Sequence, residues 1–363
     1  MERWNHHVLD KIVECIEPID KSAMEQASKR LDKLIKPIGS LGVLEELAIK
    51  LAGIFGRVNT KIEKKCVVVM SADNGVCEEG VSTCPQFITA MQTINIIKGL
   101  SGLSVLAKHA NSDIKVIDIG INGNIEYPGL INKKIKSGTF NMAKGPAMTR
   151  DEAVSAINTG IEIVGELVKD GYNLIGTGEM GIGNTSTSSA VLMAFTGLTP
   201  DKAVGRGAGM TDEGYEAKKK TILKALELNK PDKNDAIDVL SKVGGLDIAG
   251  MAGCFLGGAY YKVPVVIDGF ISAVAALVAY NINPRVKDYM IPSHISEEPG
   301  FKHAMEYIGL KPFLALEMRL GEGSGCPIAF NVIEAATEII NNMATFEEVE
   351  MNSDFLIDMR KDS

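Results

Sequence analysis

Two glutamates of this sequence stand inside glycine-rich segments. Glu179 lies in G-T-G-E-M-G-I-G-N-T (residues 176–185), and Glu322 lies in G-E-G-S-G (residues 321–325). Glycine has no side chain to shield a neighbouring carboxylate and it lets the backbone bend sharply, so each segment can present its glutamate into a cleft. Two such carboxylates indicate general-base chemistry on a bound substrate. A surface glutamate in a plain turn is the alternative interpretation of each.

The first of these segments also predicts a phosphate site. It has the spacing G-x-G-x-x-G, after an apolar run and before a helix rich in Ser and Thr. Glycines in that position let backbone N–H groups approach an anion, and the dipole of the helix N-terminus favours negative charge. Asn184 stands where a P-loop needs its lysine, which argues against hydrolysis of a nucleoside triphosphate. Asp201 follows in a turn and not at a strand end, which argues against a dinucleotide-dependent oxidoreductase. A tight turn remains the alternative.

A third glycine-rich segment completes the set. Residues 205–209 read G-R-G-A-G and precede a helical stretch that carries Lys218. This arrangement predicts the second side of the same phosphate site, and a surface loop is the alternative. No Ser/His/Asp or Cys/His constellation is visible. We expect His109, His294 and His303 to be structural or surface residues.

Composition restricts the class of protein. The chain has 363 residues, a net charge of −8, 45% hydrophobic and 23% charged residues, which is typical of a packed globular protein. An acidic chain with short basic clusters is a poor match for a phosphate backbone, so we expect no nucleic-acid partner. Its 37 glycines exceed the about 25 that an average share would give. Ten of the 37 lie in the three segments.

The cysteines and the termini bear on the compartment. The six cysteines form no C-x-x-C pair and have no histidine at metal-ligand spacing, so we expect reduced thiols in a cytoplasmic protein without a metal site. The polar stretch Met1 to Asp10 does not resemble a signal peptide. The most apolar region, Ile248 to Tyr280, is interrupted by Lys262 and Pro264 and predicts no membrane helix.

The pattern of apolar residues predicts the elements that position these segments. Short β-branched runs alternate with helical stretches, which indicates an α/β fold with a mostly parallel, Rossmann-like sheet flanked by helices. The expected strands are 66–70, 115–119, 172–175 and 263–267. The expected helices between them are 89–109, 151–169, 187–195 and 214–228.

Both ends of the chain are predicted to be helical. Apolar positions repeat at helical spacing over 23–35, 41–54 and 327–343. We therefore predict a small helical domain made from residues 1–60 plus 326–363, beside a large α/β domain, 61–325, that carries the active site.

At these motifs the sequence resembles the nicotinate-nucleotide–dimethylbenzimidazole phosphoribosyltransferase family, over about Leu31 to Glu350. The motifs that carry the resemblance are K-P-I-G-S-L-G (36–42), A-D-N-G-V (72–76), residues 178–185, G-R-G (205–207), G-G-L (244–246), D-G-F-I-S (268–272), Ser293-His294 and L-G-E-G (320–323). Their number and order make the resemblance specific.

The resemblance implies a reaction and roles for residues. The family moves phosphoribose from nicotinate mononucleotide to an aromatic base and inverts the glycosidic configuration from β to α, without a cofactor. Glu322 matches the general base, and Glu179 matches a second carboxylate of the site. The implied phosphate- and nucleotide-binding residues are Gly178, Gly181, Ile182, Gly183, Asn184, Gly207, Lys218 and Asp268. A dimer is also implied, either of identical chains or with a paralogous chain.

The implied pocket for the aromatic base departs from the family pattern. It includes Asn74, Cys84, Met91 and Gln92; Asn74 replaces a common histidine, and the family's glutamine aligns with Met91, with Gln92 shifted by one place. These departures leave two alternatives. One is a phenol or p-cresol phosphoribosyltransferase that works as a subunit of a hetero-oligomer. The other is a non-catalytic subunit that supports an active paralogue, against which the retained Glu179 and Glu322 argue.

Overall fold

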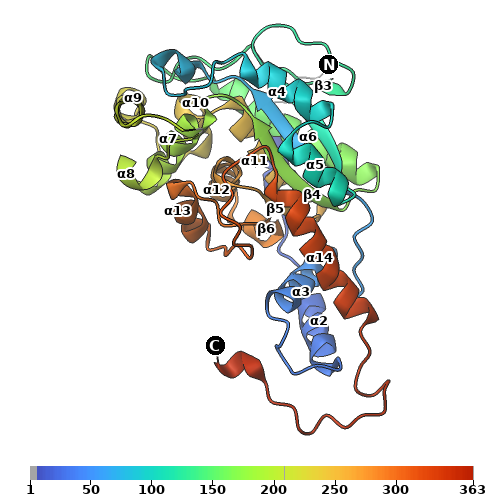
Figure 1. Ribbon diagram of the computed structural model, residues 1–363. Helices are drawn as coiled ribbons and strands as arrows, with labels where there is room; N and C mark the ends of the chain where they lie inside the picture. The colour runs from blue at the N-terminus through green and yellow to red at the C-terminus, as the bar shows by residue number, and fades with distance from the viewer. Residues whose placement is uncertain (1–5, 208, 363) are drawn as a thin grey trace.

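Six parallel strands form the centre of the computed structural model, which describes residues 6–207 and 209–362 (Figure 1). The strand order is β3-β2-β1-β4-β5-β6, and every neighbouring pair is parallel. The strands are β1 (Lys65–Ala72), β2 (Asp113–Gly120), β3 (Leu130–Asn132), β4 (Leu174–Met180), β5 (Val265–Ile267) and β6 (Met290–Pro292). The predicted Rossmann-like α/β class is confirmed. The strand order reverses between β1 and β4, and ligands of such sheets bind outside the carboxyl ends of the strands at this point.

The central strand β1 is buried on both faces. Cys66, Val68 and Met70 belong to one apolar cluster and Val67 and Val69 to the other, and none of these side chains is exposed. Successive side chains of a strand point to opposite faces, so a continuous apolar run is what a doubly covered strand needs.

One face of the sheet is covered by α11 (Leu246–Tyr261) and α12 (Phe270–Ile282), and α6 (Arg150–Lys169) and α10 (Ala236–Val243) pack on these helices. Glycines allow α6 and α11 to pack with their backbones close together. A Cβ on Gly160 would lie 2.0 Å from the carbonyl oxygen of Gly250, and one on Gly253 would lie 1.9 Å from that of Ile157. The short helix α1 (His6–Glu14) also packs on α6 and α11.

The other face is covered by α4 (Ile88–Ile97), α5 (Gly102–His109) and the first part of α14 (Gly325–Asn342). Figure 1 shows α14 continuing below the sheet, where α2 (Lys21–Lys33) and α3 (Val43–Phe55) pack against it. The predicted division at residues 60/61 and 325/326 stays a prediction. Within its N-terminal part, α1 packs on α6 and α11, and residues 1–5 are outside the described chain.

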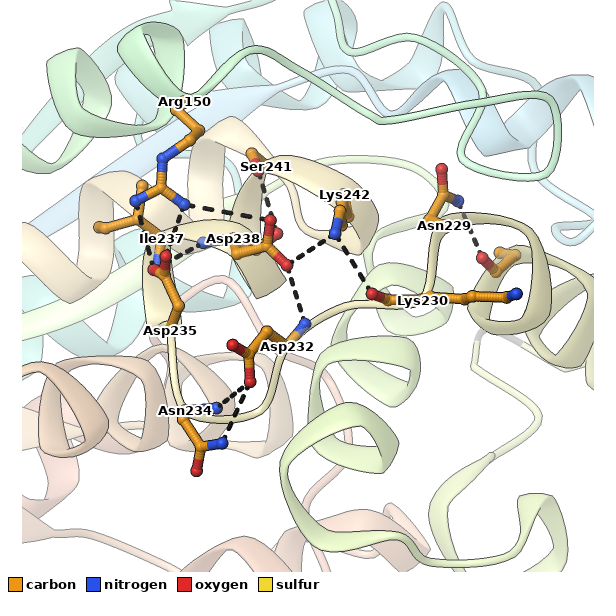
Figure 2. A network of polar contacts seen from close by, with 11 residues as sticks. Arg150, Asn229, Lys230, Asp232, Asn234, Asp235, Ile237, Asp238, Ser241 and Lys242 are labelled. Carbon is orange, nitrogen blue, oxygen red and sulfur yellow. Dashed lines mark hydrogen bonds and ion pairs between the residues drawn. The ribbon is translucent and has the colours of Figure 1, made fainter.

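The remaining helices surround the carboxyl ends of β4 and β5. They are α7 (Asn184–Thr196), α8 (Pro200–Ala203), α9 (Asp212–Asn229) and α13 (Pro299–Ile308). Three 3-10 helices lie elsewhere: Gly75–Glu79 follows β1, Pro284–Tyr289 packs on α11 and α12, and Met359–Asp362 lies near Ile38. The connection from α9 to α10 is held by an exposed polar network (Figure 2), in which Arg150 contacts Asp235 and Lys242 contacts Asp238. No helix of the described residues is long and apolar enough to cross a membrane.

Several predicted boundaries are wrong in an informative way. The strand expected at 172–175 continues to Met180, so half of the first glycine segment is strand and not loop. The helix expected at 89–109 is two helices, because Gly99 adopts a positive φ of 80° and Ser101 caps α5. The turn expected at Asp201 is the short helix α8. Strands β3 and β6 are three residues each, too short to give a periodic signal.

Candidate active site

A cavity of about 240 Å³ opens at the carboxyl ends of β4 and β5. It brings together the end of β4, the N-terminus of α7, the start of α12 and the loop that precedes α14. The three glycine-rich segments, far apart in the chain, all contribute to its wall. Its lining includes Ser82, Gln92, residues 178–185, Gly207, residues 268–272, His294, Ser296, Glu298 and residues 319–322.

Glu322 lies at this cavity in a strained backbone conformation. Its φ is +63°, between Gly321 at +85° and Gly323 at +99°, and the left-handed region is costly for a side chain larger than glycine. Its Oε1 accepts a hydrogen bond from Gln92 Nε2 (2.6 Å) and its Oε2 accepts one from the N–H of Leu103 (3.1 Å). The carboxylate is therefore buried and held, and not unshielded as the flanking glycines predicted.

Gly178 explains how the Glu322 loop reaches this position. A Cβ on Gly178 would lie 2.3 Å from the carbonyl oxygen of Glu322. The missing side chain lets the loop pass directly against β4. The structure thus gives Gly178 a packing role, although its backbone also lines the cavity. The sequence analysis assigned it to the phosphate instead.

Glu179, the next residue of β4, is bonded to the same loop. Its Oε1 accepts the N–H of Glu322 (3.1 Å), and its Oε2 accepts a bond from Asn184 Nδ2. Burial, with a smaller contribution from the charge of Asp247, raises the pKa of Glu179 to about 8. The two glutamates predicted from separate segments are therefore neighbours in one network.

Asp247 is a third buried carboxylate, and the sequence analysis missed it. It lies in the first turn of α11 and its Oδ2 accepts a bond from Asn184 Nδ2 (3.0 Å). Burial raises its pKa to about 6. The sequence feature that could have pointed to Asp247 is the Gly244-Gly245 pair before it, because a Cβ on Gly245 would lie 2.4 Å from Asp247 Oδ1. The Asn184 side chain bridges two carboxylates, so only its backbone is left to meet a phosphate.

Asp268 holds the loop that carries Glu322. Its two oxygens accept the N–H groups of Gly323 (3.1 Å) and Gly325 (2.6 Å). Burial raises the pKa of Asp268 to about 7, although these N–H groups oppose that shift. The sequence analysis expected a nucleotide contact here. The carboxylate instead positions the loop, while the residue also lines the cavity.

His294 has partners that the sequence did not reveal. Its Nδ1 lies 3.0 Å from Ser293 Oγ and 4.0 Å from Asp268 Oδ1. Ser293 is fully buried and its hydroxyl donates to the carbonyl oxygen of Asp268, so these residues do not form a nucleophilic triad facing the cavity. Burial lowers the pKa of His294, which keeps the imidazole neutral near pH 7.

The same cavity has backbone groups that suit an anion, and Lys218 lies behind them, outside the lining residues. Gly183 precedes α7 with φ +91°, and the backbone from Gly181 to Asn184 lines the cavity. Lys218 is 1% exposed and its ammonium donates to Thr185 Oγ1 (2.9 Å) and to the carbonyl oxygen of Gly205 (3.0 Å). Burial lowers its pKa to about 8. Lys218 thus joins the first and second glycine segments; Ala208, inside the second, is not described.

Of the four residues predicted for the base pocket, only Gln92 lines the cavity. Gln92 faces the cavity and bonds to Glu322. Met91, one residue earlier on α4, is 53% exposed, because one step along a helix turns the side chain by about 100°. In this chain it is therefore Gln92, and not Met91, whose side chain reaches the cavity. Cys84 is half-buried and Asn74 is fully buried; neither lines the cavity, and Ser82 does so in their place.

Comparisons with known proteins identify the family of this chain. Residues 16–351 match a family described as "Phosphoribosyltransferase". A Clostridium tetani protein named nicotinate-nucleotide–dimethylbenzimidazole phosphoribosyltransferase is 54% identical, over 98% of both chains. This chain belongs to that family. A relative of the same name from Ruminiclostridium cellulolyticum is 52% identical over 94% of this chain and 97% of its own.

A solved structure extends the agreement to the fold. The crystal structure of CobT from Thermus thermophilus is 38% identical and superposes with a TM-score of 0.87, over 91% of this chain and 99% of that one. The predicted family resemblance is confirmed, and the protein is a phosphoribosyltransferase. The names of these relatives favour dimethylbenzimidazole over the phenol alternative. Among the described residues, the phosphoribosyltransferase has no group of three or more His, Cys, Asp or Glu side chains that could hold a metal ion.

Proposed function

We propose that this enzyme transfers 5-phosphoribose from nicotinate mononucleotide to 5,6-dimethylbenzimidazole or a related aromatic base, giving an α-ribotide used to assemble the nucleotide loop of cobamides. The names of its relatives support the substrates. The observation that carries the proposal is the Glu322 carboxylate, fixed at the cavity by Gln92 and by the N–H of Leu103.

In the proposed reaction Glu322 acts as the general base. A ring nitrogen of the incoming base forms the new bond to C1′ of the ribose, and the bond from C1′ to the nicotinate nitrogen breaks. Nicotinate leaves with that electron pair, which neutralises its pyridinium and requires no acid. The N–H proton of the base goes to Glu322. Each Glu322 oxygen accepts one hydrogen bond in the structure, which leaves acceptor capacity for that proton.

Glu179 is proposed to assist at the same carbon. Positive charge develops on the ribose as nicotinate departs. Because burial raises its pKa to about 8, Glu179 is largely protonated near pH 7 in the free enzyme. The pyridinium of the bound nucleotide favours the ionised form of Glu179, which then stabilises that charge. Glu179 is bonded to the backbone of Glu322 and to Asn184, so it is already oriented before substrate binds.

The phosphate is proposed to bind across the cavity from the carboxylates. Backbone N–H groups from Gly181 to Asn184, with Gly207 and Lys218, would contact it. An ammonium has three N–H donors, and Lys218 uses two of them on Thr185 and Gly205. The third is left for a phosphate oxygen.

A product assay tests the proposal. The full chain is supplied with nicotinate mononucleotide and an equimolar mixture of 5,6-dimethylbenzimidazole, benzimidazole, adenine, phenol and p-cresol, and the ribotides are identified by mass spectrometry. We expect benzimidazole-type α-ribotides to dominate. A phenolic product from this mixture would favour the phenol alternative, and no product from the purified chain would favour the non-catalytic subunit.

We further propose a cytoplasmic dimer. Large apolar side chains are exposed near the cavity, including Phe87 at 62% and Leu320 at 59%, and contact with a second chain would cover them. The six cysteines are free thiols, as in a reducing compartment. Light scattering of the purified chain would give its mass in solution, and mixing with a paralogue would separate a homodimer from a heterodimer.

A further inference from the structure

Glu298 is a cavity residue to which neither the sequence motifs nor the proposed reaction gives a role. It occupies the N-cap position of α13, but its side chain makes no capping hydrogen bond to that helix. Instead it lines the main cavity and also an adjoining one of about 730 Å³, together with Gly207 and Arg319. It therefore lies on the phosphate side of the proposed site.

The carboxyl group of Glu298 is only half satisfied. Its Oε2 is buried and has no hydrogen-bond partner among the described residues. A Cβ on Gly205 would lie 1.8 Å from that oxygen, so the second glycine segment lies directly on the carboxyl group. Burial raises the pKa of Glu298, while the charge of Lys218 and the N–H of Gly207 act in the opposite direction. An ionised oxygen left without a donor in such a place is costly.

The charged groups around Glu298 are few. Lys218 approaches from α9 but makes no ion pair with Glu298 within 4.0 Å, since its ammonium is bonded to Thr185 and Gly205. Arg319 comes from the loop before Glu322 and lines both cavities, and Arg206 is paired with Asp212. The neighbouring Glu297 is exposed, and α7 contributes the uncharged Thr185.

We propose that Glu298 binds the substrate's phosphate as the neutral acid, with its carboxyl group turned from the Gly205 backbone toward the cavity so that its O–H donates to a phosphate oxygen. This inference rests on the proposed function. An ionised Glu298 beside a phosphate dianion would be repelled strongly in a buried site. The protonated carboxyl group instead offers an O–H that can donate a hydrogen bond to a phosphate oxygen, which itself only accepts. Where Glu298 is ionised in the free enzyme, binding takes one proton from solvent.

Calorimetric titration with nicotinate mononucleotide tests this. The full chain is titrated at pH 6.5, 7.5 and 8.5, each in two buffers of different ionisation enthalpy, which gives both Kd and proton uptake. Glu298→Gln retains a donor that does not titrate, and Glu297→Gln removes the same charge one residue away as the matched control. Lys218 and the phosphate titrate in every protein, so the difference between proteins isolates Glu298.

We expect the wild-type Kd to rise with pH more steeply than the Kd of Glu298→Gln between pH 6.5 and 8.5, by up to about tenfold for each pH unit above the pKa of Glu298, because a group that must be protonated weakens binding as it ionises. Proton uptake at pH 8.5 falls in Glu298→Gln and not in Glu297→Gln.

Two results would overturn the inference while leaving the proposed function standing. One is a Glu298→Gln protein, folded by circular dichroism, that binds about tenfold more weakly at every pH. The other is unchanged proton uptake in that variant. A wild-type chain that does not bind nicotinate mononucleotide would overturn the proposed function and this inference together.

Discussion

Two networks of carboxylates in this molecule are built in opposite ways. In the exposed network at the α9–α10 connection (Figure 2), Asp235 pairs with Arg150 at 2.7 Å and Asp238 with Lys242 at 2.8 Å. At the cavity, Glu179, Asp247, Asp268 and Glu322 accept hydrogen bonds from amides and backbone N–H groups. None of these four has a lysine or arginine ion pair among the described residues.

The two networks shift the pKa values of their carboxyl groups in opposite directions. Burial acts to raise the pKa of Asp235, but the hydrogen bond from Arg150 and the N–H of Asp238 outweigh it and lower that pKa. At the cavity burial prevails, and the pKa of Glu179 rises to about 8. The surface network uses its charges to stabilise the fold. The four carboxyl groups at the cavity have no lysine or arginine partner among the described residues, so a cationic substrate is what would favour their ionised forms.

Removing the general base should have the largest effect. Glu322→Gln keeps the bond to Leu103 but cannot accept a proton, so we expect kcat to fall by about 10²–10⁴-fold with little change in the KM for nicotinate mononucleotide. Steady-state formation of the α-ribotide measures both. Glu317→Gln, an exposed glutamate in the same loop, is the control. Wild-type kcat in Glu322→Gln would remove Glu322 from its role.

The second largest effect is expected from displacing the loop that carries Glu322 while every carboxylate is kept. Gly178→Ala places a Cβ 2.3 Å from the carbonyl oxygen of Glu322, and a shift of about 1 Å in a catalytic group can cost about 10²-fold in rate. Gly145→Ala is the matched control, since a Cβ there meets nothing within 4 Å. Equal kcat values in the two variants would mean that the loop tolerates the displacement.

A smaller effect is expected in the pH dependence of the free energy of unfolding, where a cavity carboxyl group and a surface carboxyl group should behave differently. The pKa of Glu179 is raised from 4.5 to about 8 in the folded state, so the folded protein retains a proton that the unfolded chain releases. Stability therefore falls as pH rises between these values, by about 1.4 kcal/mol for each unit. Glu179→Gln removes this loss and should be the more stable protein at pH 7.5.

Urea unfolding at pH 5.5, 6.5 and 7.5 measures the slopes. For Asp235 the sign is opposite: its lowered pKa gives stability that is present above its ordinary pKa and disappears only as pH falls through the lowered value. Asp235→Asn should therefore run parallel to wild type over this range. A Glu179→Gln slope equal to that of wild type would contradict the raised pKa.

The smallest effect is expected in the exposed network itself. Arg150→Met removes an ion pair whose side chains are 46% and 39% exposed, and such pairs contribute about 0.5 kcal/mol. The kcat of the variant should equal that of wild type. High salt should abolish the stability difference, because exposed charges are screened. A loss of kcat here would mean that the two networks are coupled.

Much of the fold was predictable from local pattern, because β1 and α6 are long and strongly apolar on the faces they bury. The extent of β4 was not. Residues 176–180 look like a loop by composition, yet tertiary packing holds them in a strand, and Gly178 is glycine because Glu322 passes over it. The secondary-structure propensity of a segment depends on its own residues alone, so it contains no information about the contact between Gly178 and the Glu322 loop.

The candidate site was predicted in part for the same reason. Glu179, Glu322 and Lys218 follow from glycine spacing and from the family motifs. For Asp247 the local signal was only the Gly244-Gly245 pair before it, because its burial against Asn184 depends on tertiary contacts. Whether Met91 or Gln92 faces the cavity depends on how α4 is rotated about its axis. A shift of one residue in an alignment exchanges the two.

The helix α14 gives the molecule a mechanical property. Its first residue, Gly325, is bonded to Asp268 beneath the Glu322 loop, and its far end packs on α2 and α3. Its 18 residues span about 27 Å as one rigid rod. A side-chain change that tilts this rod at α3 moves its other end against the backbone of the general base. Packing around α2 and α3 is therefore part of the alignment of the active site, although those helices lie far from the reacting atoms.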